Sequence, residues 1–355
     1  MRKISYTILS LLLFSLIALY SCGGTDRIAR SGSGGVLIVA SKSGDDVYII
    51  DRWDGKVLKV LPAGREPHEV EVSDDGRFAV VCNYGDRENA GNTLSVYDIP
   101  AGELIRTIDL GEHTRPHGMQ WITGTTRMLV TTEGSQHLLM VDIATGEIIR
   151  AMHTGEPLSH MVAATPDFSM AFVPSIMTGN VVVFDLESGE LIKRIFSGAG
   201  AEGIAMHNLG NEVWVTNRDE NTISVIDTRS LKVVETIPCK DFPIRGKFTP
   251  DGRYFLVSNA RSGDIALFRV SSRELVARIK LTPPVPDGVD ETRYFAGFGE
   301  TSIPIGLVVP DNRWAYVANT RSDVVSIIDL EKLRITGHFA VGREPDGINY
   351  SPLSP

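Results

Sequence analysis

The chain has 355 residues, 43% of them hydrophobic, and a formal net charge of −9. This length allows one large core or several domains. The acidic balance, without a long run of like charge, argues against nucleic acid and anionic lipid surfaces as main partners, because both favour basic patches.

The first segment has the pattern of an export signal. Arg2 and Lys3 precede an apolar run over 8–20 that is too short for a membrane-spanning helix. The run ends just before Cys22, which resembles a bacterial lipoprotein signal whose cysteine becomes the lipidated first residue. We therefore expect a signal peptide over 1–21, a lipid anchor on Cys22 with a Gly- and Ser-rich tether over 22–35, and a location in the bacterial cell envelope. If the cell is Gram-negative, we expect that location to be the outer membrane. An ordinary secretory signal cut nearby is the alternative.

From residue 36 onward the chain repeats one strand pattern, β-branched and bounded by Asn, Asp or Gly. Its copies are Val36–Ser41, Phe78–Asn83, Met128–Glu133, Met170–Ser175, Glu212–Asn217, Tyr254–Asn259 and Trp314–Asn319. Most copies are followed by a second strand pattern that ends in Asp, whose side chain accepts from the next backbone N–H groups and stabilises a tight turn. A long repeat with four strands is typical of a propeller blade.

These segments resemble the YVTN family of β-propeller repeats. The resemblance is closest over Trp314–Pro352 and Val213–Asn217. It extends from Val36 to the C-terminus, although Thr132-Glu133 and Pro174-Ser175 replace the usual Thr-Asn. Relatives of this kind include the haem-binding propeller of periplasmic nitrite reductases, lactonase propellers and many binding proteins. The resemblance therefore implies the fold and says little about function.

The ends of the repeat array predict how the ring closes. The chain starts in the second strand of a blade and finishes in an innermost strand over 347–350. We predict an all-β, seven-bladed β-propeller of four-stranded antiparallel blades over 36–355, closed by the C-terminal strand joining the N-terminal blade, which removes an open edge. Cys82 and Cys239 fall in different repeats, so we expect buried thiols and no disulfide between them.

The start of each innermost strand is the predicted functional position. Equivalent positions beside the central channel hold Asp346, His68, His117, His160, Glu202, Ile244, and Pro304 or Ile305, in blade order. The three histidines could converge on a transition metal ion or a haem-like group, with Glu202 or Glu69 completing the ligand set. Chance is the alternative explanation, because polar residues gather in these loops anyway. His113, His137 and His153 are expected on the same face.

Arginines accompany the histidines at this channel mouth. They are Arg65, Arg115, Arg245 and Arg343. Guanidinium groups there suit a carboxylate or phosphate ligand. Surface pairing with neighbouring glutamates is the alternative for each of them.

Two insertions are predicted on the same face. Residues 84–92 are expected to form a solvated loop. Residues 282–302 carry Tyr294, Phe295 and Phe298, whose exposure to water would be costly, so we expect this segment to fold over the mouth as a lid.

Two classes of function follow. The first is a monomeric binding module, without chemistry of its own, for a partner protein or a small anionic ligand at the His/Arg-rich mouth. The second is an envelope enzyme or cofactor-handling protein, an oxidoreductase or lactonase-like hydrolase, that uses the histidine cluster. Sequence motifs of serine hydrolases, phosphate loops and His-Glu-x-x-His metal sites are absent.

Overall fold

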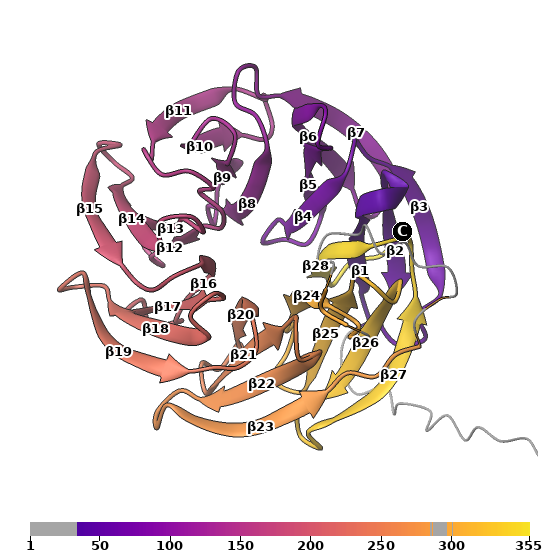
Figure 1. Cartoon of the computed structure of the whole chain (residues 1–355). Coiled ribbons are helices and arrows are strands. Elements are labelled where there is room, and N and C mark those ends of the chain that lie inside the picture. Colours follow the sequence, from indigo (N-terminus) through magenta and orange to yellow (C-terminus); the bar gives the residue numbers. More distant parts are fainter. Residues whose placement is uncertain (1–33, 285, 287–296, 300) are drawn as a thin grey trace, which may run out of the picture. The chain divides into compact units, whose positions relative to one another are not determined.

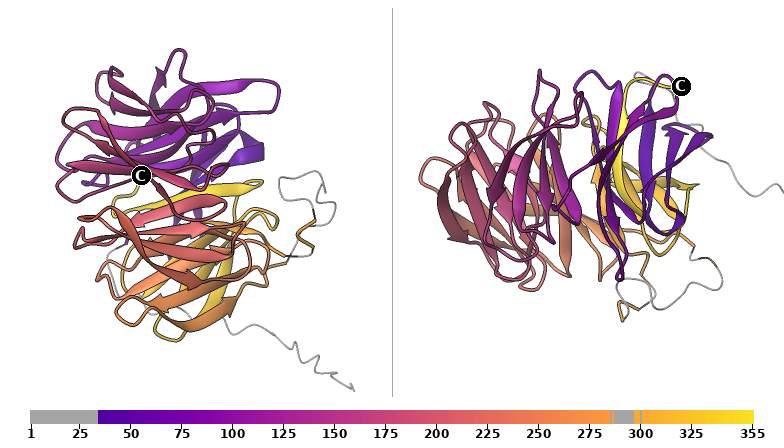
Figure 2. Two further views of the ribbon diagram at one scale, coloured as in Figure 1. Left: turned by 60° about the vertical axis from the view of Figure 1, so that its left-hand side comes forward. Right: turned by 90° about the horizontal axis from the view of Figure 1, so that it is seen from above.

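The computed structural model of the protein describes residues 34–284, 286, 297–299 and 301–355. These residues form seven four-stranded antiparallel sheets arranged as blades around a central axis (Figure 1). Figure 2 shows the same blades from two further directions. The predicted all-β, seven-bladed propeller is therefore confirmed. Within the described residues, no helix has the length and apolar character needed to cross a membrane.

Several sequence predictions lie outside the described residues. They are the signal peptide over 1–21, the lipidated Cys22 with most of its tether, and Tyr294 and Phe295 of the predicted lid.

Each blade contributes four strands, ordered from the innermost strand outward. The strands are β28 (Pro345–Ser351), β1 (Val36–Ser41), β2 (Asp46–Asp51) and β3 (Val57–Pro62); β4 (Pro67–Val72), β5 (Phe78–Gly85), β6 (Ala90–Asp98) and β7 (Glu103–Asp109); β8 (Pro116–Trp121), β9 (Arg127–Thr132), β10 (His137–Asp142) and β11 (Ile148–His153); β12 (Ala163–Ala164), β13 (Met170–Pro174), β14 (Asn180–Asp185) and β15 (Leu191–Phe196); β16 (Ala201–Met206), β17 (Glu212–Asn217), β18 (Thr222–Asp227) and β19 (Lys232–Pro238); β20 (Pro243–Phe248), β21 (Tyr254–Asn259), β22 (Asp264–Arg269) and β23 (Glu274–Lys280); β24 (Pro304–Val308), β25 (Trp314–Asn319), β26 (Val324–Asp329) and β27 (Arg334–Ala340).

The C-terminal strand closes the ring. β28 pairs antiparallel with β1, with Val36 opposite Ser351 and Ile38 opposite Asn349. The first blade thus takes its innermost strand from the other end of the chain, as the repeat count predicted. Because β28 covers it, β1 is paired on both sides and does not form an open edge of the first blade.

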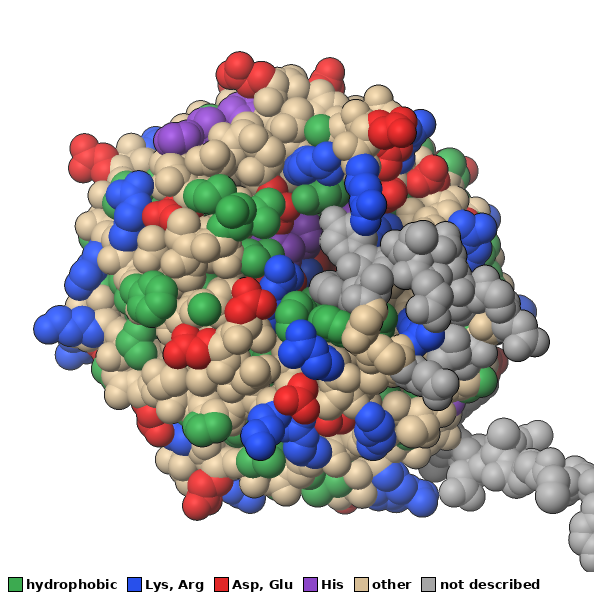
Figure 3. Space-filling model, viewed as in Figure 1, with side chains coloured by type: hydrophobic (Ala, Val, Ile, Leu, Met, Phe, Trp, Pro, Cys, Tyr) green, Lys and Arg blue, Asp and Glu red, His purple; other side chains and the backbone are tan. Residues whose placement is uncertain are grey.

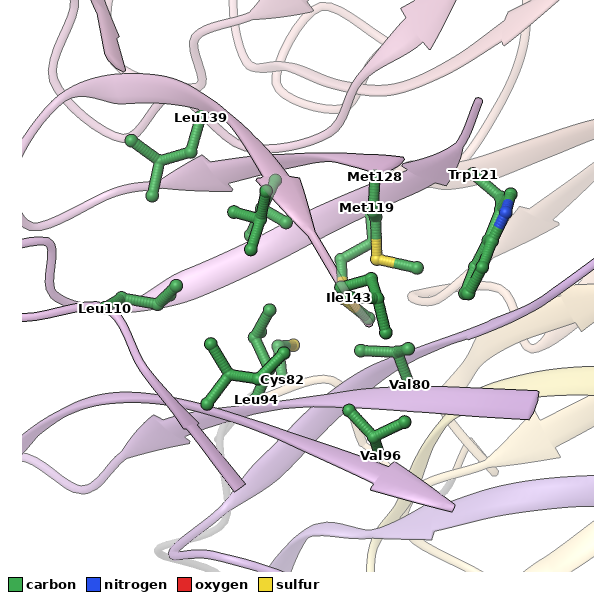
Figure 4. Packing of buried hydrophobic residues seen from close by; sticks show 13 residues of the cluster. Val80, Cys82, Leu94, Val96, Leu110, Met119, Trp121, Met128, Leu139 and Ile143 are labelled. Carbon is green, nitrogen blue, oxygen red and sulfur yellow. The ribbon is translucent and has the colours of Figure 1, made fainter. Parts of the chain in front are cut away.

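The hydrophobic core lies between neighbouring blades. In one such layer, Val80 and Leu94 of the second blade pack against Met119 and Leu139 of the third (Figure 4). The middle strands are apolar on both faces because a blade is covered on both sides, whereas the outer strand β3 is largely exposed. Cys82 and Cys239 are free and buried, as predicted.

Each innermost strand is entered through one irregular backbone geometry. In six blades the residue directly before the strand has a positive φ, and in the fourth blade the positive-φ residue precedes the isolated bridge of Ser159 with Ser175. These residues are Glu66, Arg115, Leu158, Gly200, Phe242, Ile303 and Glu344. Beyond this point the pairing with the second strand shifts register, for example between Pro116 and Met119 in β8. A bulge of this kind re-aims the residue within it. In β8 that residue is His117, the second residue of the strand.

Glycine follows the re-aimed residue in several blades because the innermost strands almost touch. A Cβ on Gly118 would lie 2.4 Å from the Cα of Met161, and one on Gly347 would lie 2.2 Å from the carbonyl oxygen of His68. The Pro-x-Gly sequence therefore reflects close packing of backbones around the axis.

We predict that ring closure dominates stability. Deleting 345–355 removes β28 and uncovers Val36 and Ile38, which are 0% and 1% exposed. Each large apolar side chain returned to water costs about 1.5–3 kcal/mol, so the free energy of unfolding should fall by several kcal/mol. Deleting only the exposed 353–355 is the matched control and should change it by less than about 0.5 kcal/mol. Equal stability of the two truncated chains in denaturant titrations would contradict closure by β28.

Candidate functional site

A cavity of about 150 Å³ opens at the channel mouth, and we call it the mouth pocket. Figure 3 shows the central hollow, with histidine and charged side chains inside it. Seven of its lining residues are the re-aimed residues of the seven blades: His68, His117, His160, Glu202, Ile244, Ile305 and Asp346. The sequence predicted this ring of equivalent positions, with Ile305 rather than Pro304 in the seventh blade.

The rings of three histidines contact one another in turn along one wall of the mouth pocket, edge to face in the first pair and tilted in the second, and we call this row the histidine stack. The ring centroids of His68 and His117 lie 5.3 Å apart, and those of His117 and His160 lie 3.9 Å apart. Tyr84 extends the stack, with its ring 4.3 Å from that of His68. Innermost strands of consecutive blades supply the first two histidines, and His160 lies three residues before the short strand β12. Residues far apart in sequence thus become neighbours through the ring.

His160 lies between two buried carboxylates. Its Nδ1 is hydrogen-bonded to Glu133, and its Nε2 lies 3.2 Å from Oε1 of Glu202. Burial opposes protonation, but the charges of Glu133 and Glu202, together with the hydrogen bond to Glu133, outweigh it and raise the pKa of His160. The imidazolium form of His160 is therefore stabilised, with one carboxylate beside each ring nitrogen.

The other two histidines of the stack favour the neutral form. Burial, followed by the nearby charge of His160, lowers the pKa of His117 well below its ordinary value of 6.5. Burial, followed by the charge of Lys42, lowers the pKa of His68. His68 Nδ1 donates to the carbonyl oxygen of Glu66 at 2.8 Å, because a carbonyl only accepts. His117 Nδ1 is buried without a hydrogen-bond partner.

Arg245 crosses the channel beneath the stack. Its Nη2 lies 2.7 Å from Glu69 Oε1, and its Nη1 lies 3.1 Å from Glu202 Oε1. Burial alone would lower the pKa of Arg245, but the charges of Glu69 and Glu202 outweigh it and raise it. Burial alone would likewise raise the pKa of Glu202, yet His160, Arg218 and Arg245 lower it to about 2. Glu69 and Arg245 occupy the position that holds glycine in the Pro-x-Gly blades.

The remaining predicted arginines do not line the mouth pocket. Arg65 is exposed and pairs with Asp86. Arg343 is also exposed, and its carbonyl oxygen accepts from Ser41. The guanidinium of Arg115 lies 4.9 Å from the ring centroid of Tyr84 and donates to the carbonyl oxygen of Asp86. The αL backbone of Arg115 lies before the bulge, so its side chain is not re-aimed toward the axis.

The predicted solvated loop over 84–92 is wrong for its first residue. β5 continues to Gly85 and β6 begins at Ala90, so most of the insertion extends a hairpin. Tyr84 is 8% exposed, and its hydroxyl donates to Glu133 Oε2 at 2.5 Å. The insertion thus supplies a wall of the mouth pocket.

Of the predicted lid residues, Phe298 lies within the described part of the chain. Its ring centroid lies 4.8 Å from that of Phe242, beside Ile244, Ile303 and Ile305. Phe298 therefore packs on the apolar side of the mouth, opposite in character to the histidine wall.

Sequence reasoning missed a second ring of lining residues. Each one directly follows the residue of the second strand pattern that pairs with the start of the innermost strand: Lys42, Tyr84, Glu133, Ile176 and Arg218. The register pairs Pro67 with Asn83 and Pro116 with Thr132, so Thr132, not Glu133, stands at the Asn position of the repeat. The predicted copy Met128–Glu133 was therefore displaced by one residue toward the C-terminus, since the strand is Arg127–Thr132. The correct alignment would have placed Glu133 in this ring.

The mouth pocket contains one group suited to a metal ion. Among the described residues, only His117, Glu133 and His160 bring three such ligand atoms within 4.8 Å of one another, and all three residues are buried. Two ligand atoms on one tetrahedral ion lie about 3.3 Å apart, given bonds of about 2.0–2.1 Å, so side-chain rotation would close the set. His68 and Tyr84 lie at its edge. The predicted trio of His68, His117 and His160 thus becomes two histidines and a carboxylate.

A smaller cavity of about 40 Å³ lies on the other side of Arg245, lined by Glu71, Met119 and Lys247 among others. Burial raises the pKa of Glu71 from 4.5 to about 7, against the lowering charge of Lys247. Burial also raises the pKa of Asp346 to about 7. Each of the two cavities lined by Arg245 therefore contains a carboxyl group with a raised pKa, Asp346 in the mouth pocket and Glu71 in the smaller cavity.

The raised pKa of Glu71 predicts a pH-dependent stability. The folded protein holds this proton up to about pH 7, whereas the unfolded chain releases it near 4.5, so its stabilising contribution is lost as pH rises through that window. Glu71→Gln keeps the neutral shape at every pH. The stability of the variant relative to wild type should therefore increase between about pH 4.5 and 7 and then level off. A difference that stays flat in urea unfolding across this range would contradict the buried-acid assignment.

Comparison with curated proteins gives remote relatives. The chain is 24% identical over 223 residues to Protein NirF of Pseudomonas aeruginosa, covering 59% of this chain and 54% of that protein. It is 22% identical over 205 residues to Protein NirF of Stutzerimonas stutzeri, covering 55% and 52%. The chain thus matches about half the length of these relatives.

Solved structures agree on the fold. Hydrazine synthase of Kuenenia stuttgartiensis superposes with a TM-score of 0.67 at 19% identity, covering 83% of this chain and 92% of that one. A functionally unknown protein from Desulfotomaculum acetoxidans superposes with a TM-score of 0.72 at 13% identity, covering 90% and 99%. At these identities the likeness establishes the fold alone.

The family model of the YNCE-like β-propellers matches residues 113–294. This match spans half of the chain and includes the blades that supply His117, Glu133, His160 and Glu202. It agrees with the propeller resemblance read from the repeats. The protein belongs to the YNCE-like β-propeller family.

Proposed function

We propose that this protein is a ligand-binding lipoprotein of the bacterial cell envelope, and that its mouth pocket binds a divalent transition metal ion or a metal-bearing cofactor. The observation that carries the proposal is the buried group of His117, Glu133 and His160. Imidazole and carboxylate are ligands for such ions. A binding role is favoured over catalysis, because nothing in the pocket points to a particular substrate.

The charges of the pocket favour a metal over a free anion. Arg245 and Arg218 already bind carboxylates, with Arg218 Nη1 2.7 Å from Glu202 Oε2. An anion would have to compete with these buried pairs. By contrast, His117 Nδ1 is buried and has no hydrogen-bond partner. A neutral imidazole has one unprotonated nitrogen, which can donate its lone pair to a metal cation. A partner protein at the same face stays a prediction of the sequence.

The site also has the outer contacts that metal ligands usually need. One carboxylate oxygen of Glu133 accepts a hydrogen bond from the hydroxyl of Tyr84, and the other is hydrogen-bonded to Nδ1 of His160. An ion bound here would take the place of the proton held between His160 and Glu133. Hydrogen bonds that orient a ligating carboxylate typically add 10–100-fold to metal affinity, so Tyr84 supports the site.

The metal proposal predicts an affinity that depends on His117 and Glu133. Protein freed of metal with a chelator should bind Co²⁺ at this site, and His117→Ala or Glu133→Gln should weaken that binding at least tenfold. Binding should also weaken as pH falls through the raised pKa of His160, because the proton and the ion compete. Equilibrium dialysis and the visible absorption of Co²⁺ measure both effects.

His207→Ala is the control for these variants, because His207 packs on Phe248 away from the mouth pocket. Thermal unfolding checks that each variant is folded. Equal Co²⁺ affinity in wild type, His117→Ala and Glu133→Gln, with all three folded, would refute the metal site.

The envelope part of the proposal rests on Arg2, Lys3, the apolar run over 8–20 and Cys22. Cells supplied with labelled palmitate should label the wild-type protein and recover it with membranes. Cys22→Ser should abolish labelling, whereas Cys239→Ala, which removes a buried thiol, should not. Labelling of Cys22→Ser, or none in wild type, would contradict the lipid anchor.

A further inference from the structure

A second group of histidines lies apart from the mouth pocket, at the rim of the third blade. It consists of His113, His137 and His153, and we call it the rim row. The ring centroids of His113 and His137 lie 4.8 Å apart, and those of His137 and His153 lie 5.0 Å apart. Figure 3 shows histidine side chains at the upper rim, over the blade of β10 and β11. None of the three lines the mouth pocket.

The fold fixes two of these residues opposite each other. His137 opens β10 and His153 ends β11, and the antiparallel register pairs them directly. Side chains directly opposite on neighbouring strands have Cβ atoms about 4.5–5.5 Å apart. His113 reaches the same place from the loop before β8. Solvent exposure grows along the row, from buried His113 through half-buried His137 to exposed His153.

The spacing of the rings is that of ligands on one ion. Two imidazoles on a tetrahedral ion, with bonds of about 2.0–2.1 Å, have centroids about 5 Å apart. Both neighbouring pairs of the rim row already show this spacing. In the described residues the three nitrogens do not all lie within 4.8 Å of one another, so a three-histidine set needs a ring rotation, for which exposed His153 has the most room.

The central ring is oriented as a metal ligand. His137 Nδ1 lies 2.6 Å from the carbonyl oxygen of Ser135, which only accepts, so Nδ1 carries the proton and Nε2 keeps its lone pair. Ligating histidines almost always donate their other N–H to such an oxygen. The hydroxyl of Ser135 also lies 3.4 Å from His113 Nδ1, so one residue positions two rings.

We propose that the rim row is a second metal site, in which His137 and His153, joined by His113, bind a divalent transition metal ion of the Zn²⁺, Ni²⁺ or Cu²⁺ class. Imidazole ligands without a carboxylate suit these ions and not Mg²⁺ or Ca²⁺, which prefer oxygen. The site is open to solvent at His153, so it loads from the outside of the ring. It does not depend on the mouth pocket being a metal site.

The test isolates the rim row in a protein that carries His117→Ala and Glu133→Gln. This protein should still bind one equivalent of Cu²⁺, and its electron paramagnetic resonance spectrum should show nitrogen hyperfine splitting from imidazole. Adding His137→Gln or His153→Gln should weaken binding at least tenfold and reduce the nitrogen splitting. Adding His207→Gln is the matched control and should leave both unchanged.

Thermal unfolding without metal checks that the rim variants keep the fold, which is expected because His137 and His153 are at least partly exposed. Zn²⁺ titration by calorimetry repeats the measurement with an ion that has no redox chemistry. The proposal is overturned if the isolating background binds no Cu²⁺ or Zn²⁺. It is equally overturned if His137→Gln and His153→Gln bind with the affinity of that background.

Discussion

The pairing of β1 with β28 is the constraint on which the rest of the molecule depends. It completes the first blade and fixes the circumference of the ring. The circumference in turn decides how closely the innermost strands approach, so close at Gly118 and Gly347 that a Cβ would collide with the next strand. Side chains re-aimed by the entry bulges then meet over the axis. His68, His117 and His160 are neighbours because the closed ring brings the entries of three blades together, although these residues lie far apart in the sequence.

The second determinant is the compensation of buried charge. Arg245, Arg218 and His160 share the carboxylates of Glu69, Glu202 and Glu133. Removing one member of such a group leaves a buried charge unpaired, which typically costs about 3–5 kcal/mol. The network also sets the chemistry of the mouth pocket. Its cationic side chains are already paired with carboxylates, whereas the imidazoles of His68 and His117 are neutral. The preference for a metal over a free anion follows from this balance.

Much of the fold was predictable because its signals are local and repeated. Blade count, closure and the ring of equivalent positions from His68 to Asp346 follow from one strand pattern and its spacing. Glu133 and Tyr84 were missed because their role depends on a register shift of one residue and on a hairpin longer than expected. The directions of Arg65, Arg115 and Arg343 were also beyond the sequence, since they depend on which side of the bulge each residue lies. Pairing across the channel, as in Arg245 with Glu69, appears only after closure.

The most direct test of the metal-binding account is an anomalous difference map from crystals grown with Zn²⁺ and measured at the zinc absorption edge. We predict a peak in the mouth pocket about 2.0–2.2 Å from nitrogens of His117 and His160 and an oxygen of Glu133. A well-ordered mouth pocket without a peak, in which His160 is still hydrogen-bonded to Glu133, would contradict it. This result counts when the same crystal shows a fully occupied Zn²⁺ ion at another site.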